Sequence, residues 1–143
     1  MKALTLMQPW ATLVAIGAKK IETRSWPTKY RGPLAIHASK RFPKEFKRLL
    51  GEEPFFSVLY KAGYANPINH ALGAIIAICQ LIEVWENNDP FLMPISSQER
   101  AFGDYRPGRY MWLLKDIKKL DKPISIKGSL GLWEWKEENH DRT

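Results

Sequence analysis

Gly17-Ala18-Lys19-Lys20-Ile21-Glu22-Thr23-Arg24 is the stretch from which the fold is best worked out, because it joins an apolar helical pattern to a charged strand pattern. Glycine can adopt the left-handed conformation that ends a helix, so Gly17 predicts a helix end. From Ile21 the residues alternate, which places Glu22 and Arg24 on one strand face and Ile21 and Thr23 on the other. Taken alone, this pattern also fits an exposed edge strand with an ordinary ion pair.

The residues before this stretch predict a strand followed by a short helix. Residues 2–7 alternate as a first strand, and Pro9 suits the first position of a helix because its missing N–H would be unpaired there. Trp10, Leu13, Val14 and Gly17 lie at helical spacing. We therefore expect a helix that turns Trp10, Leu13 and Val14 toward the core.

The residues after this stretch predict a third strand and two helices. Residues 28–32 form a basic turn, and residues 33–38 form a strand that carries His37. Ser39 or Pro43 could begin an amphipathic basic helix through Leu50, and residues 55–63 could form another short helix.

The second half of the chain begins with a pattern typical of a central strand. Residues 71–84 are rich in isoleucine and apolar on both faces, with Gly73 permitting a bend. Later segments are a loop at 87–94, a helical turn at 96–102 begun by Ser96 or Ser97, strands at 109–114 and 130–135, a polar turn at 121–123 within 117–126, and a tail at 136–143 that we expect to fray.

These elements show no regular β-α alternation and no internal repeat. They predict an α+β, β-rich fold in which a partly closed antiparallel β-barrel is flanked by short helices. With 143 residues, the chain has the length of one domain.

The positive charge is concentrated in one part of the sequence. The net charge is +7, and residues 19–48 hold ten Lys or Arg against two Glu. A basic segment favours a polyanionic partner such as a nucleic acid or nucleotide. A solvated basic face is the alternative.

Several other classes of site are disfavoured. Cys79 is the single cysteine, and His37, His70 and His140 are far apart in the sequence without a metal-binding motif, so we expect neither a metal nor a cofactor. The longest run without a charge or amide, 71–79, is far shorter than the roughly 20 residues that span a bilayer. We expect a soluble, cytoplasmic protein, with no membrane partner and a monomer as the default state.

Basic and aromatic residues alternate in the segment that begins at Lys19, which is typical of surfaces that bind single-stranded nucleic acid. Cations can follow the phosphates while an exposed Trp or Tyr stacks on an unpaired base. Near the C-terminus, Lys127, Gly128 and Ser129 could add an ammonium, backbone N–H groups and a hydroxyl. The candidate binding residues are Lys19, Lys20, Arg24, Trp26, Tyr30, Arg31, Lys40, Lys127 and Ser129.

Catalysis on the same residues is the second hypothesis. Burial near Arg24 would lower the pKa of Lys19 and make it a possible base, whereas Glu22 would raise it. The candidate catalytic residues are Lys19, Glu22, Tyr30 and Ser129.

The pattern G-x-K-x-x-E-x-R at residues 17–24 resembles the hallmark of the ASCH domain, the activating-signal-cointegrator homology domain of the PUA-like superfamily. The preceding Leu6-Met7-Gln8-Pro9-Trp10-Ala11 resembles the family's Q-P-W entry, and 31–38 resembles its R-G-x-L-x-I-x-A strand. Lys127-Gly128 with Trp133 is similar to the family's C-terminal K-G-x-x-x-x-W.

The resemblance implies a β-barrel related to RNA-binding PUA domains, with a cleft beside the first helix. It also implies roles in RNA processing, translation or transcription regulation. One enzymatic branch removes the acyl group from N4-acetylcytidine with Lys, Thr and Glu; here Lys19 matches, but Glu22 occupies the threonine position. A ribonuclease branch uses Lys, Tyr and Ser, for which Lys19, Tyr30 and Ser129 are the counterparts.

The sequence thus gives three hypotheses. The first is binding of RNA, other single-stranded nucleic acid or a nucleotide-like ligand in a basic cleft around Lys19, Glu22 and Arg24. The second is a hydrolase on that cleft, either a ribonuclease or an N4-acetylcytidine amidohydrolase. The third is a protein-interaction module in transcription coactivation.

Overall fold

The computed structural model describes residues 1–88 and 94–136. Most of the predicted 87–94 loop and nearly all of the predicted frayed tail lie outside the described residues.

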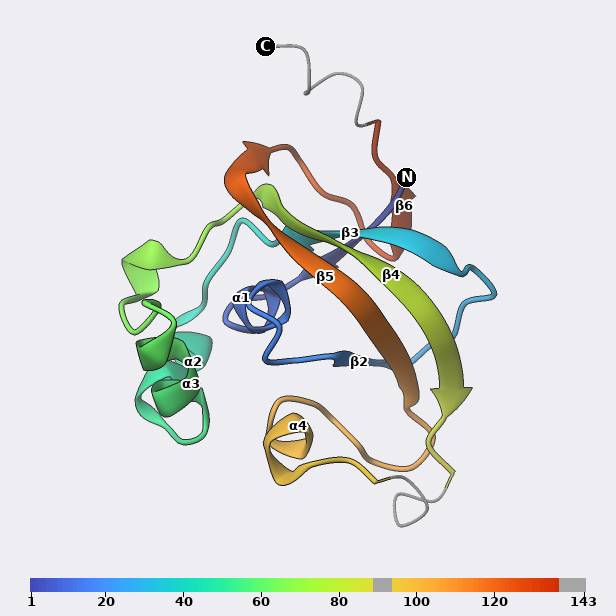
Figure 1. Ribbon diagram of the computed structural model, residues 1–143, viewed down its shortest axis with the longest axis horizontal. Helices are drawn as coiled ribbons and strands as arrows, with labels where there is room; N and C mark the ends of the chain where they lie inside the picture. Colours follow the sequence, from blue (N-terminus) through green and yellow to red (C-terminus); the bar gives the residue numbers. More distant parts are fainter. Residues whose placement is uncertain (89–93, 137–143) are drawn as a thin grey trace.

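Six strands in the described residues form one sheet in the order β2-β5-β4-β3-β1-β6. Around it lie short α-helices and two 3-10 turns (Figure 1). The strands are β1 Lys2–Leu6, β2 Ile21–Arg24, β3 Gly32–Ala38, β4 Ala74–Glu86, β5 Tyr110–Ser125 and β6 Leu132–Glu134. The helices are α1 Trp10–Ala15, α2 Lys44–Lys47, η1 Arg48–Gly51, α3 Phe55–Lys61, η2 Pro67–Asn69 and α4 Ser97–Ala101.

The sheet curves into a half-barrel, which confirms the predicted partly closed barrel. Within the described residues, four of the five strand pairs are antiparallel, as expected, and β1 pairs with β3 in parallel. The sheet is therefore mixed. The parallel pair arises because α1 and β2 lie between β1 and β3 in the sequence and provide a crossover connection.

Helix α1 lies against the concave side of the half-barrel and packs on β1, β3, β4 and β5 (Figure 1). Its Ala11, Val14 and Ala15 join strand residues such as Ile36 and Trp112 in the main core. Leu13 of the same helix points to a second core, which α3, η1 and Phe102 complete. The helix is thus buried on two sides, as its apolar spacing predicts.

The central strand β4 is covered on both faces, as predicted from its apolar sequence. Ile76 and Ala77 belong to the main core, whereas Ile75 packs with Ala3, Ala35 and Trp135 on the other face of the sheet. Its neighbours in the sheet are β3 and β5. Gly73, directly before the strand, has a φ of +62°, which fits the expected bend.

The predicted polar turn at 121–123 is wrong, because β5 runs without interruption from Tyr110 to Ser125. Backbone pairing with the long β4 satisfies its hydrogen bonds however polar the side chains are. Pro123 lies in a stretch where the register of the β4–β5 pair is irregular. Beyond Leu113, β4 is the only strand among the described residues that pairs with β5, so a residue without an N–H group is tolerated there.

The predicted basic helix is shorter than expected. It begins after Pro43, one of the two predicted starts, but α2 ends at Lys47 and a 3-10 turn, η1, continues to Gly51.

The last strand is also shorter than predicted, at Leu132–Glu134. The helix predicted for 55–63 is confirmed as α3.

Candidate functional site

The charged stretch lies where the predicted helix end and strand meet. Gly17 has a φ of +81°, and β2 begins at Ile21. Beneath this junction, the Lys19 side chain is fully buried. Its Nζ donates to the carbonyl oxygens of Ile21 at 2.6 Å and Phe102 at 2.9 Å, and lies 3.6 Å from Glu22 Oε1.

Lys19 is therefore a buried cation that joins β2 to the segment after α4. Burial lowers the pKa of Lys19, and the nearby Glu22 carboxylate opposes that shift. This is the direction that the base hypothesis requires. However, its amine faces acceptor oxygens of the protein, and Lys19 lines neither of the two cavities described below.

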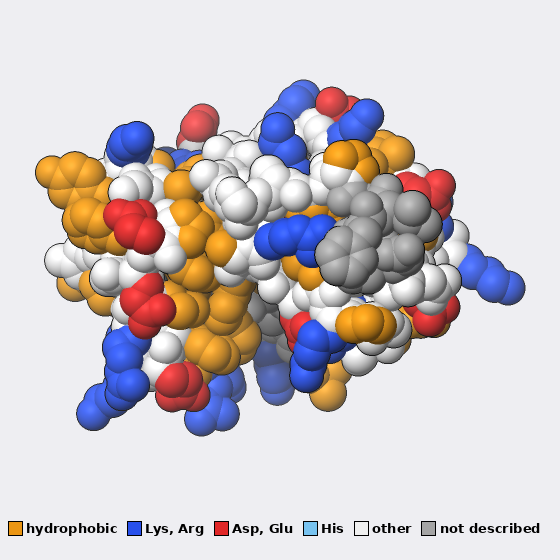
Figure 2. Space-filling model, turned by 90° about the horizontal axis from the view of Figure 1, so that it is seen from below, with side chains coloured by type: hydrophobic (Ala, Val, Ile, Leu, Met, Phe, Trp, Pro, Cys, Tyr) orange, Lys and Arg blue, Asp and Glu red, His pale blue; other side chains and the backbone are white. Residues whose placement is uncertain are grey.

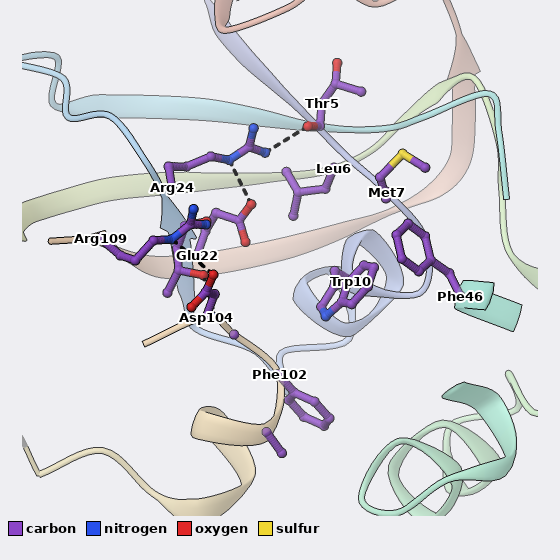
Figure 3. A pocket seen from close by; sticks show the side chains of 13 residues that line it. Thr5, Leu6, Met7, Trp10, Glu22, Arg24, Phe46, Phe102, Asp104 and Arg109 are labelled. Atoms are coloured by element: carbon purple, nitrogen blue, oxygen red, sulfur yellow. Dashed lines mark hydrogen bonds and ion pairs between the residues drawn. The ribbon is translucent and has the colours of Figure 1, made fainter. Parts of the chain in front are cut away.

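Glu22 and Arg24 form the ion pair that their shared strand face predicts. Arg24 Nε donates to Glu22 Oε2 at 2.9 Å, and Arg24 also donates to the backbone carbonyl of Thr5 at 2.9 Å. Arg24 thus links β2 to β1 across the opening of the half-barrel (Figure 3).

Glu22 and Arg24 open onto a cavity of about 440 Å³, which we call the aromatic cavity. Figure 3 shows the Glu22 carboxylate between Arg24 and the wall that Leu6 and Trp10 form. Trp10 meets the Phe46 ring edge-on, with ring centroids 4.9 Å apart. The lining comprises Thr5, Leu6, Met7, Trp10, Glu22, Thr23, Arg24, Phe46, Ala101, Phe102, Gly103, Asp104 and Arg109.

The segment from Gly103 to Arg109 supplies a second group of charges that sequence reasoning missed. Asp104 binds Arg106, whose hydrogen bonds lower the pKa of Asp104 to about 2, and one Asp104 oxygen lies 3.6 Å from Arg109 Nε. The Asp104 backbone N–H also donates to the Thr23 hydroxyl at 3.0 Å. The signal in the sequence was the run of Asp, Arg and Gly just before a strand.

A second cavity, of about 650 Å³, adjoins the first, and we call it the basic cavity. Both cavities are lined by Thr5, Met7 and Arg24. The remaining lining of the basic cavity comprises His37, Ser39, Lys40, Gly73, Ile126, Lys127, Gly128, Ser129, Leu130 and Gly131.

A chain of hydrogen bonds forms one wall of the basic cavity. Trp133 Nε1 donates to the Thr5 hydroxyl at 3.1 Å, and that hydroxyl lies 3.1 Å from His37 Nδ1. His37 Nε2 lies 2.7 Å from the carbonyl oxygen of Ile126. Because a carbonyl only accepts, Nε2 carries the proton and Nδ1 accepts from Thr5. Burial lowers the pKa of His37.

The predicted binding residues divide into two groups. Arg24, Lys40, Lys127 and Ser129 meet at the basic cavity. The predicted residues that line neither cavity are Lys19, Lys20, Trp26, Tyr30 and Arg31.

These outlying residues have other contacts. Trp26 packs edge-on against Trp112 with centroids 5.0 Å apart, the Tyr30 hydroxyl donates to the Pro33 carbonyl, and Arg31 pairs with Glu83 at 2.9 Å. The face that carries α4 shows Lys and Arg side chains spread among hydrophobic and uncharged ones (Figure 2). On that face the Lys and Arg side chains do not form one continuous patch (Figure 2).

Of the four candidate catalytic residues, only Lys19 and Glu22 lie close together, with Lys19 Nζ 3.6 Å from Glu22 Oε1. The Lys19 amine is hydrogen-bonded to two backbone carbonyls, and Tyr30 lies outside both cavities. Of Lys19, Tyr30 and Ser129, only Ser129 lines the basic cavity. Glu22 is the fourth candidate and faces the aromatic cavity. Within residues 1–88 and 94–136, no group of His, Cys, Asp or Glu side chains is arranged to hold a metal.

A half-barrel with a cleft beside its first helix defines a PUA-like domain. The ASCH domain family model matches residues 4–123. The chain therefore belongs to the ASCH domain family, as its sequence motifs indicated, and this family is PUA-like and associated with nucleic acids.

Two curated relatives are activating signal cointegrator 1 from Homo sapiens and from Mus musculus. Each is 26% identical to this chain over 140 residues, which cover 96% of the chain and 22% of the relative. The chain thus spans about a fifth of the length of these relatives.

Solved structures confirm the fold. The crystal structure of ASCH from Zymomonas mobilis superposes with a TM-score of 0.56 at 15% identity, covering 96% of this chain and 88% of that one. A mutant of the same Zymomonas mobilis protein gives a TM-score of 0.55, also at 15% identity, covering 96% of this chain and 91% of that one. No helix among the described residues is long and apolar enough to cross a membrane.

Proposed function

We propose that this chain binds single-stranded nucleic acid, with RNA as the first candidate, across the two adjoining cavities. The observation that carries the proposal is that Thr5, Met7 and Arg24 line both cavities. One ligand could therefore occupy an aromatic compartment and a cationic compartment at once.

The aromatic cavity has the character of a base-binding compartment. Half-buried Trp10 and Phe46 line it, and aromatic side chains stack on unpaired bases whatever their sequence. Its volume of about 440 Å³ is in the range of small-molecule sites. Glu22, Arg24 and Arg109 supply acceptors and donors for a base edge.

The basic cavity has the character of a phosphate-binding compartment. Lys40 and Lys127 are exposed at its edge, and Arg24 stands where it joins the aromatic cavity. Ser129 adds a hydroxyl from an exposed position on the same side. These cations come from three different parts of the chain and could contact successive phosphates of an extended strand.

Membership of the ASCH domain family supports a nucleic-acid partner. A role in RNA processing, translation or transcription regulation, at a cytoplasmic location, is part of the same proposal. The relatives named activating signal cointegrator 1 make transcription regulation the first process to examine.

The proposal is tested by titrating a fluorescent single-stranded RNA at several salt concentrations between about 50 and 200 mM. We expect affinity to fall as salt rises. Replacing Lys40 and Lys127 by alanine should reduce the slope of log affinity against log salt by about one for each phosphate that the protein no longer neutralises.

The matched control is the double substitution Lys29→Ala with Arg31→Ala, which removes two cations from outside both cavities. It should leave the slope close to that of the wild type. Equal reductions of the slope in the two double variants would contradict binding in the two cavities. They would favour binding to a diffuse basic surface. Binding without salt dependence would contradict the phosphate compartment.

A further inference from the structure

We infer that the aromatic cavity selects guanine, through the carboxylate of Glu22. This inference rests on the proposed function, because it names the base that the nucleic-acid cleft would prefer. It begins from a charged group that is almost completely buried and yet lines a cavity.

Glu22 is held in a fixed position by cations on one side. Its side chain is 11% exposed; Arg24 Nε lies 2.9 Å from Oε2 and Lys19 Nζ lies 3.6 Å from Oε1. Each carboxylate oxygen thus has one cationic neighbour from the protein. Since each oxygen can accept two hydrogen bonds, both retain capacity for a ligand.

Two adjacent acceptors require a ligand with two adjacent donors. Among the four RNA bases, guanine alone presents two donor groups side by side, N1–H and the N2 amino group. Adenine and cytosine place one amino group beside a ring-nitrogen acceptor, and uracil places one N–H between two carbonyls. A carboxylate would meet an acceptor or a carbonyl on each of these three bases, so its pairing favours guanine.

The neighbours of Glu22 suit the rest of the guanine edge. The guanine carbonyl O6 lies next to N1–H and needs a donor, and the guanidinium groups of Arg24 and Arg109 line the same cavity. Trp10 and Phe46 add aromatic rings to the lining of the same cavity (Figure 3). Arg24 also lines the basic cavity, so a base on Glu22 would lie next to the proposed phosphate compartment.

The test compares RNA heptamers UUUXUUU that differ only in the central base X, which is guanine, hypoxanthine, adenine, cytosine or uracil. Hypoxanthine lacks only the N2 amino group of guanine, so that pair isolates one hydrogen bond to Glu22. We expect the guanine heptamer to bind about tenfold more tightly than the hypoxanthine heptamer, the size expected for the loss of one hydrogen bond to a charged group. The other three should bind more weakly than guanine.

Glu22→Gln should bring the guanine-to-hypoxanthine ratio close to one. Glu99→Gln is the matched control, because Glu99 is another carboxylate near Lys19 but lines neither cavity, and it should keep the wild-type ratio. Thermal unfolding shows whether each variant is folded. If Glu22→Gln does not fold, the ratio measured with the wild-type chain decides alone.

The outcomes separate the two proposals. Equal affinity for all five heptamers, or a preference for another base, would overturn guanine selection and leave nucleic-acid binding intact. Absence of binding to any heptamer at low salt would overturn the proposed function and the inference with it. A guanine preference that Glu22→Gln does not alter would show that a different residue selects the base.

Discussion

Lys19 is buried next to the aromatic cavity but lines neither cavity itself. Its ammonium group reaches two backbone carbonyls, one in β2 and one at Phe102 after α4, and it stands beside Glu22. Glu22 in turn holds Arg24. The fixed geometry of the Glu22 carboxylate therefore depends on a cation that is buried behind it.

Lys19→Met should lower the free energy of unfolding by about 2–4 kcal/mol, because it removes the hydrogen bonds to both carbonyls and leaves Glu22 without its buried partner. Urea denaturation measures the change. Lys20→Met is the control, since the Lys20 side chain is exposed, and it should alter stability by less than about 0.5 kcal/mol. Equal stability of the two variants would contradict the structural role of Lys19.

His37 should make stability depend on pH. Burial lowers the pKa of folded His37 below the ordinary value, so the unfolded chain binds a proton at higher pH than the folded chain does. The contribution is fully present above the unfolded pKa of about 6.5 and is lost as pH falls toward the folded pKa. Stability should therefore decrease from neutral toward mildly acidic pH.

The measurement is urea denaturation across that pH range for the wild type and for His37→Gln. The variant should lose less stability on acidification, although His70, whose pKa burial also lowers, still contributes. Identical pH dependence in the two proteins would contradict this account of His37.

At this scale the sequence predicted the Glu22 and Arg24 pair correctly, because both residues lie on one strand face at short separation. It could not predict that the Lys19 amine is enclosed. One of its acceptors, the Phe102 carbonyl, is 83 residues away in the chain. Because this acceptor is so distant in the chain, no local sequence pattern indicates that the Lys19 side chain is buried.

At the scale of elements, the connection between β5 and β6 completes the basic cavity by packing closely on β1 and β3. A Cβ atom on Gly128 would lie 2.6 Å from His37 Cε1 and 2.8 Å from Thr5 Oγ1. Only glycine fits there without displacing the Thr5 and His37 pair. Lys127 and Ser129 owe their places beside the cavity to this close approach.

Gly128→Ala should destabilise the fold by about 1–3 kcal/mol, because the added methyl overpacks the contact with Thr5 and His37. It should also weaken RNA binding by shifting Lys127 and Ser129. Gly51→Ala is the matched control, since no atom lies within 4 Å of its added Cβ. Denaturation and RNA titration of both variants test the prediction, and equal behaviour would contradict it.

Elements with strong apolar patterns could be predicted from the sequence, whereas the continuity of the largely charged strand β5 could not. Strand β4 and helix α1 follow from their apolar spacing and are buried accordingly. Strand β5 was interrupted in the prediction because residues 115–123 are largely charged and include a proline. The strand is continuous because its backbone pairs with β4, and the polarity of its side chains does not indicate that pairing.

At the scale of the whole molecule, cleft residues come together from distant parts of the chain. Arg24 comes from β2, Lys40 follows β3, Arg109 precedes β5, and Lys127 follows β5. The sequence motifs predicted a cleft beside the first helix. They could not predict that Tyr30 and Arg31 turn to other partners, because their contacts with Pro33 and Glu83 depend on the path of the chain around β3.

Binding of nucleic acid across the two cavities can be tested by mapping the amide chemical shifts of the isotope-labelled chain during titration with the UUUGUUU heptamer. We expect the largest changes at Thr5, Trp10, Arg24 and Gly128, which line the cavities. Changes confined to Lys29–Arg31 or to the exposed lysines of β5, with the cavity residues unaffected, would contradict binding across the two cavities.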